Sequence, residues 1–195
     1  MRSPICALEA LTALALVAAP ASAQAPVTPG LGIGLAGGYY SLAGDAFAGT
    51  DAGFGGEASV HFGLGPVWTI LGGVGISSHD DASVGTLTNL RISAEPRYML
   101  RLPSSPITPF LGVRASWARL SATFAGDDYS QTGYIIGGTG GVQVRMTPTL
   151  KFEGAVTYAS ASFGDWAVNG STVTGTDASG TILALQLGVV YQRGK

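Results

Sequence analysis

Residues 54–64, FGGEASVHFGL, alternate between apolar or small side chains and polar ones. Phe54 and Phe62 fall on one face of this pattern, and Glu57 and His61 fall on the other. A repeat of two residues is typical of a β-strand, whose successive side chains point to opposite faces, and differs from the 3.6-residue repeat of a helix. The stretch therefore predicts a strand with one apolar and one polar face.

The same alternation recurs along the rest of the chain. It is found at residues 31–42, 67–77, 89–98, 111–117, 134–145, 151–158 and 183–192. Short or proline-containing turns at 63–66, 102–108 and 147–149 alternate with longer polar loops at 43–53, 78–86, 123–132 and 161–179. Such an arrangement is typical of an antiparallel meander whose first and last strands meet, which leaves no free edge. We predict an all-β fold, an eight-stranded antiparallel up-and-down transmembrane β-barrel.

The composition favours a membrane around this barrel. Charged residues make up 11% of the 195 residues, against about 25% in soluble domains. Hydrophobic residues make up 46%, and 30 residues are glycine, which suits a crowded inner face. The net charge is −2 and no run of basic residues occurs, which argues against a nucleic-acid partner. A soluble lipocalin-like ligand carrier also alternates in this way, with its apolar face inside, and is kept as an alternative.

The N-terminus has the features of a secretory signal peptide. Residues 1–23 combine an early arginine, a short apolar stretch and the small-residue sequence Ala-Ser-Ala at 21–23. We expect export into the periplasm, a periplasmic lead-in at residues 24–30 and a barrel domain at 31–193. The only cysteine, Cys6, lies in the predicted signal peptide, so cleavage would leave no thiol for disulfides or metal binding.

The two faces of the predicted strands differ in what they would contact. The polar face carries charges of both signs, which we expect to pair in a lumen plugged by side chains. The predicted lumen network is Glu57, His61, Arg91, Glu95, Arg97, Arg114, Gln143, Arg145, Lys151 and Glu153. The apolar face carries aromatic residues at both ends, which is typical of the two girdles of an outer-membrane barrel. These are Tyr39, Phe54, Trp117, Tyr134 and Tyr158 toward the long loops, and Phe62, Trp68, Tyr98, Phe152 and Tyr191 toward the short turns.

Two stretches carry a resemblance to a known family. They are AEPRYMLRLPSSPITPFLGVRASW at residues 94–117, a strand–turn–strand, and the final strand LALQLGVVYQ at 183–192. The chain resembles the small eight-stranded outer-membrane β-barrels of the OmpX, OmpA-transmembrane and opacity-protein type. This resemblance implies a Gram-negative outer-membrane location, insertion by the barrel-assembly machinery, and a structural or adhesin-like role at the cell surface.

The long loops carry the features from which a surface interaction is expected. All eight aspartates lie in or beside them, and they contain no lysine or arginine, whereas Arg101, Arg193 and Lys195 lie toward the short turns. Asp80, Asp81, Asp127 and Asp128 are candidate ligands for a divalent cation. Within the longest loop, Phe163, Trp166 and Val168 are candidate contact residues.

We predict no enzymatic activity, no catalytic residues and no cofactor. His61 is expected in the lumen network, and His79 in the second long loop beside Ser77 and Asp80. A histidine, a serine and an acidic residue could serve a lipid-A-modifying barrel enzyme, which stays open as an alternative. A narrow channel is another alternative, and it would require the ion pairs of the lumen network to rearrange.

Overall fold

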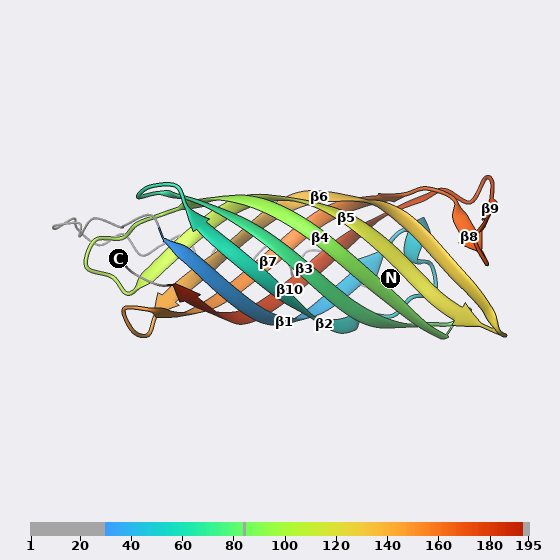
Figure 1. The fold of residues 1–195 in the computed structure, drawn as a ribbon, viewed down its shortest axis with the longest axis horizontal. Helices are drawn as coiled ribbons and strands as arrows, with labels where there is room; N and C mark the ends of the chain where they lie inside the picture. The colour runs from blue at the N-terminus through green and yellow to red at the C-terminus, as the bar shows by residue number, and fades with distance from the viewer. Residues whose placement is uncertain (1–29, 84, 193–195) are drawn as a thin grey trace, which may run out of the picture.

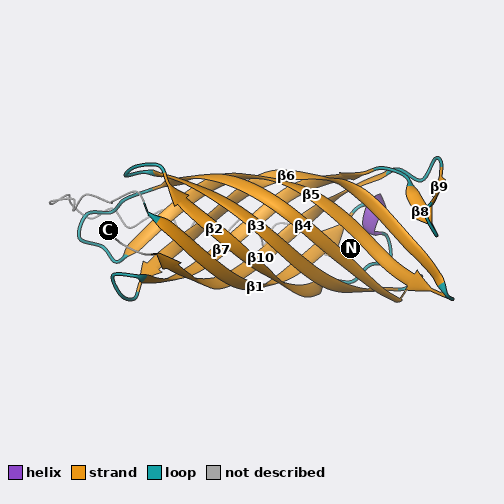
Figure 2. Ribbon diagram, viewed as in Figure 1, coloured by secondary structure: helices purple, strands orange, loops and turns teal. Residues whose placement is uncertain are grey.

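The computed structural model describes residues 30–83 and 85–192, so the predicted signal peptide lies outside the described residues. The chain forms a ring of eight long strands (Figures 1 and 2). They are β1 (Leu31–Ala43), β2 (Gly53–Gly63), β3 (Trp68–Asp81), β4 (Gly85–Met99), β5 (Ile107–Phe124), β6 (Asp127–Arg145), β7 (Leu150–Phe163) and β10 (Ala178–Gln192). Three short elements lie at one end: the 3₁₀-helix η2 (Asp45–Phe47) and the strands β8 (Trp166–Val168) and β9 (Ser171–Val173).

Each long strand pairs antiparallel with the next long strand in the chain. The short β8 and β9 lie between β7 and β10 in the sequence, but β7 and β10 pair directly with each other. The first and last strands pair from Gly32 opposite Gln192 to Ala43 opposite Thr181, and β5 pairs with β6. These pairings close the ring, so the predicted eight-stranded antiparallel barrel is confirmed. Closure satisfies the backbone groups of every long strand within the sheet, as a lipid environment requires.

Two of the predicted long loops are wrong. Within residues 78–86, β3 continues to Asp81 and β4 begins at Gly85. Within residues 123–132, β5 and β6 are joined by Ala125 and Gly126 alone, with φ angles of 54° and 93°. Positive φ at both central residues matches the right-handed twist of a hairpin. The polar composition of these two segments predicts loops, but strands that extend into water carry polar residues too.

The outer face of the barrel is apolar over its middle. Leu35, Leu111 and Leu187 are exposed by 60% or more, while their chain neighbours on each side face inward. Among the described residues, no helix is long and apolar enough to cross a membrane. Leu35, Leu111 and Leu187 lie on β1, β5 and β10, so this apolar surface belongs to the strands.

Aromatic side chains occupy both ends of this apolar surface. All ten residues of the two predicted girdles are on the outer face and at least 36% exposed. Edge-to-face contacts join Tyr39 to Phe54 at one level, with ring centroids 5.5 Å apart, and Trp68 to Tyr98 at the other, 5.3 Å apart. Amphipathic aromatic rings favour the boundary between hydrocarbon and headgroups, so the two levels mark the edges of the lipid-facing belt.

Candidate functional site: the barrel interior and its exposed end

A buried ion-pair network crosses the middle of the lumen. Glu95 is completely buried and accepts hydrogen bonds from the Nε atoms of Arg97 and Arg114. Arg114 also donates to both oxygens of Glu57, at 2.8 and 3.1 Å, and Arg97 donates to both oxygens of Glu153, at 2.9 Å. The network joins β2, β4, β5 and β7, so it holds four strands of the ring together.

Other predicted members of the lumen network have different partners. Gln143 donates to Glu153 at 2.7 Å and so extends the network. His61 is buried and bonds through Nε2 to the Ser59 hydroxyl, 3.0 Å away. Lys151 is half-buried and donates to the side-chain oxygen of Gln192.

The assignment of Arg145 to the lumen network is wrong. Arg145 is exposed because it is the last residue of β6, where the inner face opens to solvent at the short-turn end. Arg91, in contrast, is 7% exposed on the inner face, but no glutamate lies within ion-pair distance of it among the described residues.

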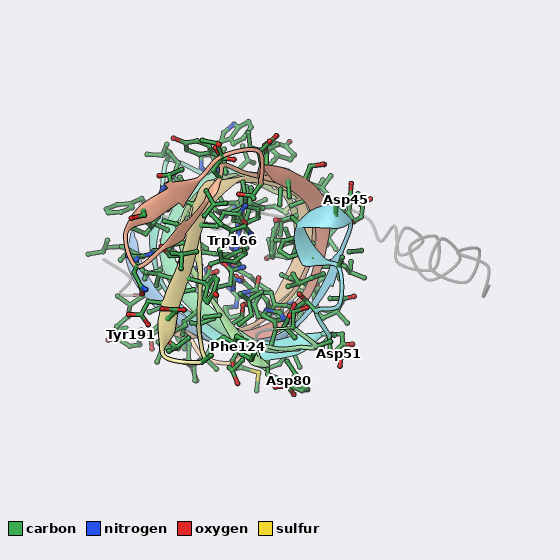
Figure 3. All side chains as sticks on the ribbon, turned by 90° about the vertical axis from the view of Figure 1, so that its right-hand side faces the viewer. Asp45, Asp51, Asp80, Phe124, Trp166 and Tyr191 are labelled. Carbon is green, nitrogen blue, oxygen red and sulfur yellow. The ribbon has the colours of Figure 1, made fainter. Side chains whose placement is uncertain are left out.

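An apolar cluster fills the lumen between the ion-pair network and the end that carries β8 and β9. The sequence reasoning did not predict this cluster. It consists of Leu42, Phe47, Leu87, Ala118, Leu120, Ala122, Ile135, Ala159, Ala161, Phe163 and Ile182. Trp166 packs against it from β8, and Figure 3 looks down the barrel onto this end. Phe163 is 2% exposed and meets Phe47 edge to face, so its assignment as a surface contact residue is wrong. Trp166 and Val168 are half-buried.

A smaller apolar cluster lies toward the short turns. Met99, Phe110 and Ala155 form it, and the Arg97 guanidinium stacks on the Phe110 ring with its carbon 4.3 Å from the centroid. A cavity of about 20 Å³ lies beside the ion-pair network and is lined in part by Glu57, His61 and Arg97. A space of that size holds about one water molecule.

The exposed end is an ordered platform. The β8–β9 hairpin pairs with β6 at Tyr129 opposite Val168. Asn169, at the tip of this hairpin, donates to the Asp127 carboxylate at 2.7 Å and accepts from the Asp128 backbone N–H at 3.0 Å. Gln131 ties the segments flanking the hairpin to the barrel by donating to the Gly164 and Thr176 carbonyls. The segment predicted as one long loop is therefore held against the β5–β6 hairpin.

The candidate cation ligands do not converge on one point. Asp80 is exposed on β3, whereas Asp81, the next residue, accepts from the Thr50 hydroxyl. Asp128 accepts from the Thr123 hydroxyl at 2.9 Å, while Asp127 holds Asn169. The described residues contain no group of three or more histidine, cysteine, aspartate or glutamate side chains placed to hold a metal ion.

His79 lies on β3, which corrects its placement in a loop. It is 1% exposed and faces the lumen, where its Nε2 lies 3.0 Å from the Ser77 hydroxyl and its Nδ1 lies 3.2 Å from the Asp51 carbonyl oxygen. Ser77 is equally buried and also accepts a hydrogen bond from Arg91. A lipid headgroup on the outer face does not reach this pair.

Arg119 is a functional candidate that the sequence reasoning overlooked. It lies on β5 opposite Leu90 and Thr132, and it is exposed on the outer face two residues beyond Trp117. Its position beyond an aromatic girdle could have been read from the spacing along the strand. A cation at this level suits the anionic headgroup region.

Comparisons with known proteins agree with this architecture. The family described as "Outer membrane protein beta-barrel domain" matches residues 10–192. No curated protein matches the chain by sequence. Among solved structures, Neisserial surface protein A is similar with a TM-score of 0.61 and 19% identity, over 83% of this chain and 96% of that one. OprG from Pseudomonas aeruginosa is similar with a TM-score of 0.55 and 12% identity, over 87% of this chain and 99% of that one.

Ail, the attachment invasion locus protein of Yersinia pestis, gives a TM-score of 0.56 and 12% identity, over 86% of this chain and all of that one. A second Ail structure is a complex with the heparin analogue sucrose octasulfate, with a TM-score of 0.51 and 11% identity over 85% and 100%. Identities this low establish the fold only. The family match and the apolar outer face together exclude the soluble lipocalin-like alternative.

Proposed function

The chain belongs to the outer-membrane protein β-barrel domain family, and from this premise we propose that it is an adhesin-like surface protein that binds a partner outside the cell. The contact end is the one bearing β8 and β9. In such barrels the short turns face the periplasm and the longer segments face the exterior. Export through the periplasm by the predicted signal peptide is part of the proposal.

The observation that carries this proposal is the ordered platform beyond the girdle. β5 extends seven residues past Trp117 to Phe124, about 23 Å along the strand. Phe124 is 50% exposed at the tip of the β5–β6 hairpin, and Val173 is 45% exposed on β9. Apolar residues presented on hydrogen-bonded hairpins lose little conformational freedom on binding, which favours their use as contact residues.

The charge of the platform indicates the chemistry of the partner. Eight aspartates lie at this end, three of which are labelled on the rim in Figure 3. They are Asp45, Asp51, Asp80, Asp81, Asp127, Asp128, Asp165 and Asp177. An acidic rim attracts a basic surface and repels a polyanion. We therefore propose a basic protein surface as the partner, in contrast to the heparin analogue bound by Ail.

Adherence of cells that display the protein tests this proposal. Displaying cells are expected to bind immobilised basic extracellular proteins and not a heparin-coated surface. Phe124→Ser and Val173→Ser together should lower that binding about tenfold, since buried anchors dominate interfaces. Thr172→Ser, on the same hairpin, is the matched control. Binding no stronger than that of non-displaying cells, or full binding by the double variant, would show that the proposal is wrong.

We further propose that the lumen conducts no ions at rest. A permeating ion would have to pass the apolar cluster around Leu120 and the Glu95 ion pairs, and the cavity beside those ion pairs holds about one water molecule. In a planar bilayer the protein is therefore expected to give no sustained conductance steps, with a large porin as the positive control. Sustained steps whose size changes in Glu95→Gln would instead support the narrow channel.

A further inference from the structure

Arg119 is an outward-facing cation without a protein partner. It forms no ion pair or hydrogen bond with any residue that the structure describes, and no other lysine or arginine points outward from the eight long strands as described. The outward-facing carboxylates of these strands, Asp80 and Asp128, lie four positions from the residues in register with Arg119 on β3 and β6, about 13 Å along each strand. Exposed charges at that separation are largely screened at physiological salt, so Arg119 is available to an anion.

Hydroxyl groups surround Arg119 on the outer face. Thr132 lies directly opposite it on β6, and Ser121 follows two residues along β5. Thr88 on β4 and Ser130 on β6 lie opposite Ser121. None of these four hydroxyls has a hydrogen-bond partner within the described part of the chain. A guanidinium with hydroxyl donors beside it suits a phosphate, and this polar patch lies beyond the aromatic girdle, at the level of lipid headgroups.

An apolar hollow opens in the lipid-facing surface beside this polar patch. Its volume is about 570 Å³, within the ~300–1,000 Å³ of small-molecule sites. The hollow exists because Gly37 and Gly56 carry no side chain, whereas Ile76 and Leu90 project beside them. Glu57 also borders the hollow, but its carboxylate is held inside the lumen by the ion-pair network. The hollow is therefore an apolar site at the surface that faces lipid.

The polar patch and the hollow lie on one row across the sheet. The row runs from Arg119 on β5 through Leu90, Ile76 and Gly56 to Gly37 on β1, each in register with the next. Neighbouring strands are about 4.8 Å apart, so Arg119 and Gly56 are separated by about 14 Å along the sheet. That is close to half of the ~30 Å hydrocarbon core of a bilayer. A lipid whose headgroup is at Arg119 therefore reaches the hollow with an acyl chain.

The row also passes from the headgroup level into the hydrocarbon. Arg119 lies two residues beyond Trp117 toward the exposed end, whereas Gly56 lies two residues from Phe54 on the membrane side. Strands in a barrel are tilted against its axis, so a row across them changes depth. The cation is thus placed among headgroups and the hollow among acyl chains.

We propose that this surface binds one phosphorylated lipid of the leaflet at the end that bears β8 and β9. The lipid phosphate accepts hydrogen bonds from Arg119 and the neighbouring hydroxyls, and one acyl chain fills the hollow over Gly37 and Gly56. Charge complementarity selects a lipid over a second copy of the chain, because the outer face between the girdles carries no carboxylate in the described strands. This inference is independent of the proposed surface contact, since the site faces lipid and not the platform.

Lipid retention by the full chain, folded in detergent and observed by native mass spectrometry, tests the proposal. The probes are dioleoyl phosphatidic acid, dioleoylglycerol with the same chains and no phosphate, and inorganic phosphate. One phosphatidic acid per barrel is expected to stay bound, at about one tenth of the concentration that dioleoylglycerol requires, because a charge-assisted hydrogen bond supplies such a difference. Inorganic phosphate at the same concentration should not displace it, since phosphate alone gains nothing from the hollow.

Three variants separate the two halves of the site. Arg119→Gln should weaken the binding of phosphatidic acid about tenfold, to the level of dioleoylglycerol. Gly37→Leu should weaken the binding of both lipids, because its side chain fills the hollow and its Cβ meets only the Gly55 carbonyl oxygen, 3.9 Å away. Gly138→Leu is the matched control, since Gly138 lies outside the hollow on β6 and a Cβ there has no neighbour within 4 Å.

Several outcomes would overturn the proposal. Equal retention of the two lipids, or displacement by inorganic phosphate, would show that no phosphorylated lipid is recognised as a whole. Unchanged binding of phosphatidic acid by Arg119→Gln or by Gly37→Leu would remove the polar patch or the hollow from the site. A lipid-free dimer that Gly37→Leu dissociates would assign the hollow to a second copy of the chain instead.

Discussion

Replacing Glu95 by alanine is expected to lower the free energy of unfolding by about 3–5 kcal/mol. Glu95 is completely buried and is the only carboxylate that accepts from both Arg97 and Arg114 in the described network. Its removal would leave two buried guanidinium groups each with a single remaining glutamate. Removing one side of a buried charge pair is costly because each guanidinium then stays buried with less compensation than before.

Urea-induced unfolding in lipid vesicles measures this effect, with the temperature at which the gel mobility shifts as a second readout. Glu153→Ala serves as a milder comparison, since Glu153 is partly exposed and Arg97 would keep its ion pair with Glu95. Its loss should therefore be the smaller one. Asp128→Asn, at the exposed end, should leave stability within about 0.5 kcal/mol of the original. If Glu95→Ala unfolded at the same urea concentration as Asp128→Asn, the network would not stabilise the barrel.

Replacing Gly137 by valine is expected to destabilise the barrel by about 3 kcal/mol. A Cβ at this inward position on β6 would overlap the Tyr158 backbone oxygen and the Cα and Cβ atoms of Ala159 on the paired strand β7. These atoms belong to the backbone or are attached directly to it, so the overlap is relieved only if β6 and β7 move apart. The barrel is too narrow to absorb that movement without disturbing Arg114, which lies opposite Gly137 on β5.

Gly138 is the matched control, one residue along the same strand. It faces outward, and a Cβ there would have no neighbour within 4 Å. Gly138→Val should leave stability within about 0.5 kcal/mol, because valine is favoured in strands and contacts only lipid. Equal losses from the two valines in a urea titration would mean that the cost is a general property of glycine positions and not of the crowded inner face.

The strand count and the faces of the lipid-embedded part could be predicted from the sequence because lipid imposes a simple rule. Between the girdles, apolar side chains point outward and polar ones inward, so Leu111 and Arg114 are assigned correctly by alternation alone. Beyond the girdle the surroundings are water, and the rule is reversed. On β5, Leu120 and Ala122 point inward while Arg119 and Thr123 point outward. The pleat continues without a break, but the polarity of its two faces exchanges just past Trp117.

That exchange explains the errors at the exposed end. The polar outward positions beyond the girdle have the composition of loops, so the extensions of β3 and β6 were missed. The sequence predicts Phe163 at the surface for the same reason, although its side chain packs inside the lumen. The partners within the ion-pair network could not be predicted, because Arg114 reaches Glu57 and Glu95 only after β2, β4 and β5 have curved into a ring.

The pairing of β1 with β10 has a consequence for the order of events in folding. Gly32 and Gln192 are partners in the register although 160 positions separate them in the chain. Until the last strand is in place, β1 presents an unpaired edge, and a curved sheet with such an edge is a template for pairing with another chain. Closing so long a segment of chain also carries a large entropic cost before any contact at the seam forms. The rate at which the final fifteen-residue strand reaches the first therefore sets how long the unclosed chain is exposed to aggregation.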